Sequence, residues 1–275
     1  MFGGLWFWKG RLASDTLGRV REAGMIRIGY AVEAPYAYLT PEGKVTGESP
    51  EIAALMAGRL GIPRVEWRLT EFSELLGGLE AGEFDVIAAG MFITPERQQR
   101  VAFSRPVFRV SPGLLVRKGN PHGLHSYADL IRQTATRIAV LSGAAEEELL
   151  LGMGFPETRL IRVPDALSGR VAVRSGRADG LVLSAPTIRW MVMNPIAGLT
   201  EMAEPFEAAT GGDARWPAFG GFVFRKSDRA LREAWDVELA RFVGTEEHLR
   251  LVRSFGFTAA EVPLAGDVLM IPPQP

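Results

Sequence analysis

Segments with strand character alternate with helical segments along this 275-residue chain, and this order constrains its fold more than any other feature. Short apolar runs indicate buried strands, whereas apolar residues spaced three or four apart indicate helices. In the first part of the chain we expect helices over 15–23, 51–60 and 73–81 and strands over 26–30, 65–69 and 86–89. Such alternation predicts an α/β fold in which helices cover a mainly parallel sheet.

The same rhythm starts again after residue 121. Here we expect helices over 127–133, 146–153 and 166–175 and strands over 137–141, 160–163 and 181–183. Segments 79–91 and 173–185 resemble each other, because each runs from a helix end through a Gly, a charged residue and an Asp into an apolar strand. The chain therefore predicts two lobes of similar build.

The last part of the chain breaks this symmetry. A strand is expected within 216–228, followed by helices over 229–243 and 245–255. This segment is too short and too helical for a third lobe, so we expect it to return to the first one. The expected division is an N-terminal segment at 1–24, a first lobe made of 25–108 and 222–275, and a second lobe at 109–221. Two strands that cross between the lobes would form a hinge, with a ligand cleft between the lobes.

Composition excludes several kinds of function. The 31 basic and 32 acidic residues leave a net charge of -1, so no overall field attracts nucleic acid or anionic lipid. The chain lacks cysteine, which excludes disulfides, thiolate metal sites and a cysteine nucleophile, and its 3 histidines are too scattered for most histidine-ligated metals. We therefore expect no metal, no other cofactor and no nucleic-acid partner.

The first residues of the chain do not form an intact secretion signal. An apolar stretch at 5–8 is followed, rather than preceded, by Lys9 and Arg11. A secretion signal has its basic residues first and a longer apolar stretch after them. No apolar run elsewhere in the sequence is long enough to span a bilayer.

Polar and aromatic residues follow the strands expected in the first lobe. Glu33 and Tyr36 come after the first strand, Phe72 after the second, and Phe92 and Arg97 after the third. The carboxyl ends of parallel strands meet at one edge of a sheet, so we expect these side chains to converge on the cleft. An Arg pairs with a carboxylate through two parallel N–H donors, aromatic faces stabilise a delocalised cation, and a Glu accepts from that cation's N–H groups. The set predicts a site for a small zwitterion.

Each of these residues also has a purely structural interpretation. A ring after a strand is more often part of the core, and Glu33 can be a solvated loop acid. Arg97 can pair at the surface with Glu96 or Glu71. The joint arrangement on three loops, rather than any single residue, favours a binding site.

Three longer segments resemble a known family. They read GYAVEAPYAYLTPEGKVTGESPEIAALMAGRLG (29–61), AGEFDVIAAGMFITPERQQRVAFSRPVF (81–108) and AFGGFVFRKSDRALREAWDVELARF (218–242). They resemble the periplasmic amino-acid-type (family 3) solute-binding proteins of ABC importers, and the similarity extends over residues 15–258. The resemblance implies a two-lobed periplasmic-binding-protein fold of type II and a binding protein without catalytic residues. It also implies that Arg97 binds the ligand's carboxylate.

The same resemblance implies the surroundings of the protein. Its partners would be a small-molecule zwitterion and the permease subunits of an ABC transporter. Its location would be periplasmic or otherwise extracytoplasmic, and it would act as a monomer.

Two departures from this family concern the ammonium group of an amino acid. Amino-acid binders usually have Thr or Ser five residues before the binding Arg, where this chain has Phe92. They also usually have Asp after the last strand of the second lobe, where this chain has Ser184. A primary ammonium would lose its counter-charge and meet a ring instead, which argues against an ordinary α-amino acid.

Within the family, the ectoine and hydroxyectoine binders are the most similar. They share the sequence EAPY, an aromatic box built from three loops, and an Arg for the carboxylate. Ectoine is a cyclic zwitterion whose amidinium is delocalised over two ring nitrogens. The resemblance implies that Glu33 accepts from these nitrogens and that Tyr36, Phe72 and Phe92 form the box.

The second lobe is expected to complete the site. A Gly-Thr-Thr-like turn of the family reads Gly143-Ala144-Ala145 here, and its backbone N–H groups can still donate to a carboxylate at a helix N-terminus. Trp216 and Phe219 lie near the second crossing and are candidates to close over the ligand. The glutamates at 146–148 open the helix after this turn, where acids stabilise the positive end of the helix dipole, and we expect no metal site there.

Alternatives from other classes remain open. A polar amino acid or a betaine is the first, because an aromatic box also accepts other soft cations. A dehydratase-like enzyme on the same scaffold is a distant second. Catalysis needs an acid or base at the reacting atom, and we expect Glu33 to be the only acid in the cleft, without a second carboxylate beside it. A sensor domain of a membrane receptor is a third alternative that only the shared fold supports.

Overall fold

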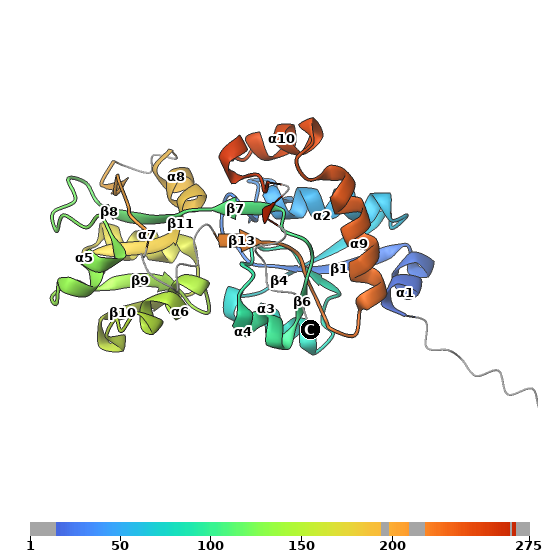
Figure 1. The fold of residues 1–275 in the computed structure, drawn as a ribbon, viewed down its shortest axis with the longest axis horizontal. Coiled ribbons are helices and arrows are strands. Elements are labelled where there is room, and N and C mark those ends of the chain that lie inside the picture. Colours follow the sequence, from blue (N-terminus) through green and yellow to red (C-terminus); the bar gives the residue numbers. More distant parts are fainter. Residues whose placement is uncertain (1–14, 194–197, 209–217, 265, 268–275) are drawn as a thin grey trace, which may run out of the picture.

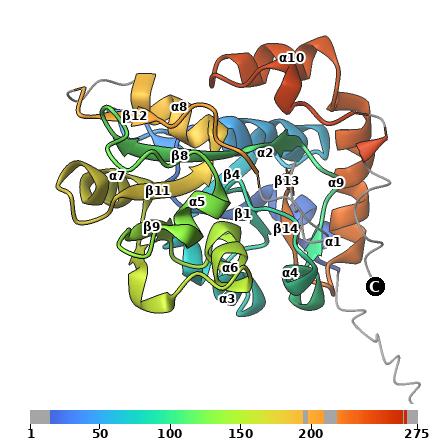
Figure 2. The same cartoon turned by 60° about the vertical axis from the view of Figure 1, so that its left-hand side comes forward.

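Two sheets form the centres of two lobes that lie side by side (Figure 1). The computed structural model describes residues 15–193, 198–208, 218–264 and 266–267. Each sheet has five strands and is flanked by helices (Figure 1 and Figure 2). The architecture is the two-lobed α/β fold that the alternating sequence pattern predicts.

The first lobe contains strands from both ends of the chain. Its sheet consists of β1 (Met25–Tyr30), β4 (Arg64–Leu69), β5 (Val86–Ile87), β6 (Ala102–Phe103) and β14 (Val223–Phe224). The strand order is β4-β1-β5-β14-β6. β1 is parallel to β4 and β5, whereas β14 is antiparallel to β5 and β6. The last part of the chain therefore returns to the first sheet.

Helices of this lobe surround its sheet, and the first of them shows how the sequence sets the ends of a helix. They are α1 (Thr16–Ala23), α2 (Glu48–Arg59), α3 (Leu75–Glu80), α4 (Pro95–Arg100), α9 (Arg229–Phe242) and α10 (Glu246–Arg253). Asp15 caps α1 by accepting from the backbone N–H of Gly18 (2.7 Å), and Gly24 ends it at a φ of 60°. The Thr16 hydroxyl donates to Asp228 (2.7 Å), so α1 packs onto the first lobe.

Short elements complete the first lobe. They are the hairpin of β2 (Tyr38–Leu39) and β3 (Val45–Thr46) and the single turns η1 (Phe72–Glu74) and η3 (Ala259–Glu261).

The second lobe repeats the same plan. Its strands are β8 (Pro112–Arg117), β9 (Ile138–Leu141), β10 (Leu160–Val163), β11 (Gly180–Ser184) and β12 (Thr200–Met202), in the order β10-β9-β11-β8-β12. Its helices are α5 (Tyr127–Arg132), α6 (Ala145–Gly152), α7 (Ala166–Arg174) and α8 (Ala185–Met193), with one short turn, η2 (Glu157–Arg159). β9 is parallel to β10 and β11, and β8 is antiparallel to β11 and β12.

A two-stranded ribbon links the lobes. β7 (Phe108–Val110) and β13 (Ala218–Gly220) pair antiparallel between the two sheets (Figure 1). The strand expected within 216–228 is two strands in the structure. β13 pairs with β7 up to Gly220, and β14 then pairs with β6 in the first sheet. A Cβ on Gly220 would lie 2.0 Å from the Phe108 ring, so only glycine fits this crossing. The predicted division at 108/109 and 221/222 falls at this ribbon and stays a prediction.

Helix α8 is an element that the sequence pattern did not predict. It follows β11 without a loop, whereas a loop was expected there. The helix faces the first lobe: the Trp190 ring packs against Tyr38 with centroids 5.4 Å apart, and Arg189 forms an ion pair with Glu261. A buried apolar cluster also joins the lobes and includes Phe72 of the first and Leu183 of the second. The structure is therefore a closed form.

The core of the first lobe depends on Trp235 in α9. Its side chain is fully buried, with ring centroids 5.5 Å from Phe222 and 5.8 Å from Phe224. We expect Trp235→Ala to lower the free energy of unfolding by about 3–5 kcal/mol, because the cavity loses these contacts. Val237 on the same helix is 51% exposed, and its change to Ala should alter stability by less than about 0.5 kcal/mol. Urea unfolding followed by circular dichroism measures both, and equal losses would contradict this packing.

Candidate functional site

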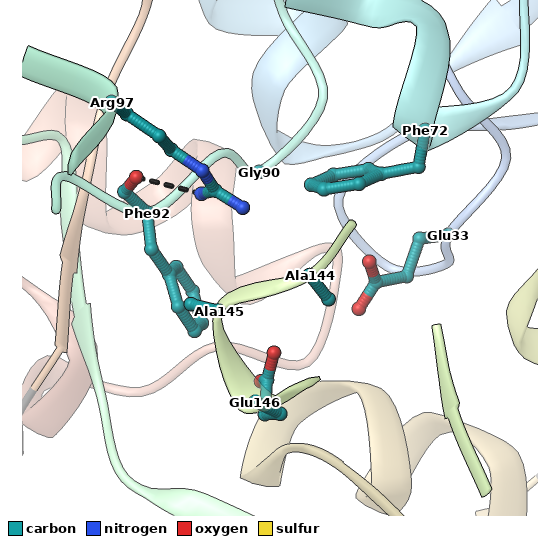
Figure 3. A pocket seen from close by; sticks show the side chains of 8 residues that line it. All are labelled: Glu33, Phe72, Gly90, Phe92, Arg97, Ala144, Ala145 and Glu146. Carbon is teal, nitrogen blue, oxygen red and sulfur yellow. Dashed lines mark hydrogen bonds between the residues drawn. The ribbon is translucent and has the colours of Figure 1, made fainter. Parts of the chain in front are cut away.

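A pocket lies between the two lobes at the carboxyl ends of their strands (Figure 3). The first lobe supplies Glu33, Phe72, Gly90, Phe92 and Arg97, and the second supplies Ala144, Ala145 and Glu146. The free space at this pocket, counted together with the open solvent at its mouth, is about 240 Å³. Of the side chains predicted from the sequence, Glu33, Phe72, Phe92, Arg97 and Ala144 line it.

Arg97 is a buried cation held by both lobes. It lies in α4, which begins where the Thr94 hydroxyl accepts from the Arg97 backbone N–H (3.3 Å). Its guanidinium donates to the carbonyl of Phe92 (2.8 Å) and, across the cleft, to the carbonyl of Gly143 (2.9 Å). The guanidinium carbon lies 5.7 Å from the centre of the Phe72 ring. With 7% of its surface exposed, Arg97 is a pocket residue and not a surface partner of Glu96 or Glu71.

Glu33 faces the pocket from the loop after β1. Reciprocal backbone hydrogen bonds with Ala37 (2.8 and 3.0 Å) fix this loop. One carboxylate oxygen of Glu33 accepts from the hydroxyl of Thr187 in α8 (2.8 Å), so the second lobe also orients it. Burial raises the pKa of Glu33 to about 8, and Glu146 adds to this rise, whereas Thr187 and Arg97 oppose it.

Glu146 is a second carboxylate in the same pocket. It lies in the first turn of α6, is 3% exposed, and its carboxyl group points toward the pocket opposite Glu33 (Figure 3). Burial raises its pKa to about 7, while its own backbone N–H and Arg97 lower it. The expectation that Glu33 has no second carboxylate beside it was wrong. Its place two residues after Ala144, where this helix faces the cleft, is the signal that could have identified it.

Two aromatic rings line the pocket directly. Phe72 is 6% and Phe92 7% exposed, and the Phe92 backbone forms a bridge with Gly220 of the linking ribbon. Phe92 also packs edge-on against Phe108, with centroids 5.9 Å apart. The Phe92 ring is therefore held by the first lobe and the linking ribbon, and Phe72 is part of the apolar cluster that joins the lobes.

Tyr36 lies behind the pocket and does not line it. A Cβ on Gly90 would lie 2.5 Å from the Tyr36 ring, so this ring packs directly against Gly90, which lines the pocket where Tyr36 does not. The ring packs against Phe108 and Phe257, with centroids 4.9 and 5.4 Å away. The expected box of three rings is thus two rings with a third packed beneath them.

Ser184 also lies behind the pocket, in a chain of hydroxyl groups. The Tyr36 hydroxyl donates to the Ser184 hydroxyl (3.1 Å), which is hydrogen-bonded to the Thr187 hydroxyl (3.2 Å). Thr187 in turn donates to Glu33, so the chain crosses from one lobe to the other and back. Thr187 was missed because α8 was not expected, and its signal is a second hydroxyl three residues after Ser184.

The turn at Gly143 uses its N–H groups within the second lobe. The Gly143 N–H donates to the Glu147 carboxylate (2.8 Å), and the Ala144 N–H donates to the Leu141 carbonyl (3.0 Å). We expected these two N–H groups to face a ligand carboxylate. In the closed form they donate within the second lobe instead, and Glu147 caps the turn. Gly143 contributes its carbonyl, to Arg97.

Of the two aromatic residues near the second crossing, the structure describes only Phe219. Phe219 is half-buried in β13 and is absent from the lining, and Trp216 lies outside the described residues. Among the residues that the structure describes, no cluster of three or more His, Asp or Glu side chains could hold a metal. None of the helices described is long and apolar enough to cross a membrane.

The buried carboxylates predict how closure depends on pH. Closing without a ligand moves the pKa values of Glu33 and Glu146 from their ordinary 4.5 up to about 8 and 7. Closure then takes up protons. The closed form therefore loses stability relative to the open one as the pH rises from the ordinary pKa of 4.5 to the raised values. We expect the radius of gyration from small-angle X-ray scattering to be larger at pH 9 than at pH 5 for the ligand-free protein. The double variant Glu33→Gln, Glu146→Gln should lose most of this difference; a radius that is independent of pH in the unaltered protein would refute the assignment.

Comparisons with known proteins agree with this architecture. The family described as bacterial extracellular solute-binding proteins, family 3, matches residues 26–257. A probable amino-acid ABC transporter periplasmic-binding protein, y4tE of Sinorhizobium fredii, is 32% identical over 254 residues, 92% of this chain and 83% of that protein. The crystal structure of EhuB in complex with hydroxyectoine is 36% identical with a TM-score of 0.82, covering 89% of this chain and 93% of that one.

A relative of another kind matches only in part. Membrane-bound lytic murein transglycosylase F of Maricaulis maris is 33% identical over 150 residues, which are 53% of this chain but 31% of that protein. The match to the family of binding proteins extends over most of the chain. This protein therefore belongs to family 3 of the bacterial extracellular solute-binding proteins, as an amino-acid-type binding protein of an ABC transporter with the type II periplasmic-binding-protein fold.

Proposed function

We propose that this protein binds a small zwitterion outside the cytoplasm, ectoine or hydroxyectoine before others, and delivers it as a monomer to the permease of an ABC importer. The observation that carries this proposal is one buried pocket in which Arg97 and Glu33 lie with the rings of Phe72 and Phe92. The guanidinium offers a site for a carboxylate, and the rings and Glu33 offer a site for a delocalised cation with N–H groups. Likeness to EhuB, solved with hydroxyectoine, supports the same choice.

The mechanism follows from the division of the pocket between the lobes. In the closed form Arg97 bonds to Gly143 and Glu33 bonds to Thr187, each across the cleft. A ligand that contacts both lobes adds to these bonds and stabilises the closed form relative to the open one. The permease would then recognise the closed form.

A polar amino acid or a betaine remains the alternative. The name of the Sinorhizobium relative supports an amino acid. Ser184 is 1% exposed and its hydroxyl is hydrogen-bonded to Tyr36 and Thr187, so a primary ammonium would have to pair with Glu33 or Glu146 instead. A betaine has no N–H group that could donate a hydrogen bond to Glu33.

An enzyme on this scaffold is the distant alternative. Glu146 supplies the second carboxylate that the sequence argument considered missing, and two carboxylates with raised pKa values can transfer protons. The family match favours binding alone. Recovery of the ligand unchanged after overnight incubation, checked by NMR, is the result expected for a binding protein, and turnover would favour the enzyme.

Calorimetry with the purified, ligand-stripped protein tests the proposed ligand. The panel contains ectoine, hydroxyectoine, glycine betaine and polar amino acids. We expect ectoine or hydroxyectoine to bind with a micromolar or lower dissociation constant, which is a binding free energy of about -8 kcal/mol or more negative. The amino acids should give no heat. Amino-acid binding without ectoine binding would contradict the ligand choice.

Arg97→Ala tests the carboxylate site. We expect the dissociation constant to rise at least about 100-fold, because a buried charge-assisted pair is lost. Arg100→Ala on the same helix is the matched control, since Arg100 pairs with Glu80 at the surface.

Phe92→Thr should weaken ectoine binding without creating amino-acid binding. An unchanged affinity in either pocket variant would disprove the assignment of that residue.

A further inference from the structure

Glu146 and Glu33 face one pocket from opposite lobes. Glu33 follows β1, Glu146 lies in the first turn of α6, and each is less than one tenth exposed (Figure 3). Both line the pocket together with Arg97, the one basic side chain among its described lining residues. The resemblance to known binders assigns Glu33 a role but leaves Glu146 without one.

The charges of these three side chains do not balance. With both carboxylates ionised, they sum to one negative charge, and a zwitterion adds none. Counted over the described lining residues, the closed complex would then bury one negative charge in excess, which is strongly unfavourable. A buried acid in such surroundings keeps a proton instead.

We propose that Glu146 forms with Glu33 a carboxyl pair that binds the cation of the ligand and holds one proton in the closed complex with a net-neutral zwitterion. The proposal rests on the proposed function and deepens it. The proton comes from solvent on closure and returns when the lobes open. Glu146 is therefore a specificity-determining residue, and ligand affinity depends on pH through it.

The groups around Glu146 are consistent with this role. Glu33 and Arg97 face it from the first lobe, and Tyr36, whose pKa Glu146 helps to raise, lies behind Gly90. On its own helix, Glu147 is already paired with Arg162. Arg97 lowers the pKa of both pocket carboxyls, but burial outweighs it and leaves them near 7 and 8.

The pair also restricts the chemistry of the ligand. An ionised carboxylate accepts hydrogen bonds, and a protonated carboxyl donates one and accepts others. A delocalised cation with N–H groups on two sides, such as an amidinium or guanidinium, can donate to both glutamates. A quaternary ammonium has no N–H group, so it would leave buried acceptors without donors. The pocket should therefore select amidinium and guanidinium zwitterions over betaines.

Calorimetry in two buffers of different ionisation enthalpy measures the proton, with ectoine, hydroxyectoine, L-arginine and glycine betaine as probes. For ectoine or hydroxyectoine at pH 6 we expect uptake of close to one proton per ligand by protein molecules that are open before binding. The dissociation constant should then rise by up to about tenfold per pH unit until the pair is ionised in the complex. L-arginine carries an additional positive charge, so any binding of it should take up no proton.

The variant Glu146→Gln separates this role from a structural one. Its amide mimics the protonated carboxyl, so we expect binding at pH 6 to survive while proton uptake and pH dependence are lost. Glu148→Gln removes a charge from the same helix turn outside the pocket and should behave like the unaltered protein. Zwitterion binding without proton uptake, or uptake that persists in Glu146→Gln, would overturn the proposal while leaving the proposed function intact. If none of the probes binds at any pH, the proposed function fails and this inference with it.

Discussion

The burial of the Arg97 guanidinium between two lobes is the constraint on which the rest of the site depends. A buried cation needs acceptors and nearby negative charge, and this one obtains carbonyls from Phe92 and Gly143. Because these carbonyls belong to different lobes, Arg97 makes both hydrogen bonds only when the cleft is closed. Glu33 and Glu146 supply the negative charge at the same place. Closing the cleft therefore brings the cation and both carboxylates together, so the charge state of the pocket affects how readily the lobes close.

Helix α8 provides the second connection between the lobes. Thr187 on its inner side holds Glu33, and Arg189 and Trp190 contact Glu261 and Tyr38 away from the pocket. A change in the pocket that moves this helix must break contacts on both sides. The protein can therefore couple the protonation and occupancy of one small pocket to the relative position of two whole lobes.

The sequence predicted the parts of the fold and site that follow from local patterns. Alternating strands and helices predicted both lobes, and the loops after three strands predicted Glu33, Phe72, Phe92 and Arg97. Tyr36 was placed in the lining because its position in the sequence does not reveal that its ring packs against Gly90 outside the lining. Glu146 and Thr187 were missed because each faces the cleft only through the packing of one lobe against the other. Contacts between lobes are long-range, and the nearby sequence signals at Ala144 and Ser184 mark a position without showing such a contact.

A crystal structure of the protein grown with ectoine would show whether Arg97, the two rings and the two glutamates bind the ligand together. The account predicts closed lobes, with the ligand's carboxylate on the Arg97 guanidinium and its ring between Phe72 and Phe92. The two ring nitrogens should donate to Glu33 and Glu146, one from each lobe. A ligand that lies elsewhere, or one whose cation faces neither glutamate, would contradict the account.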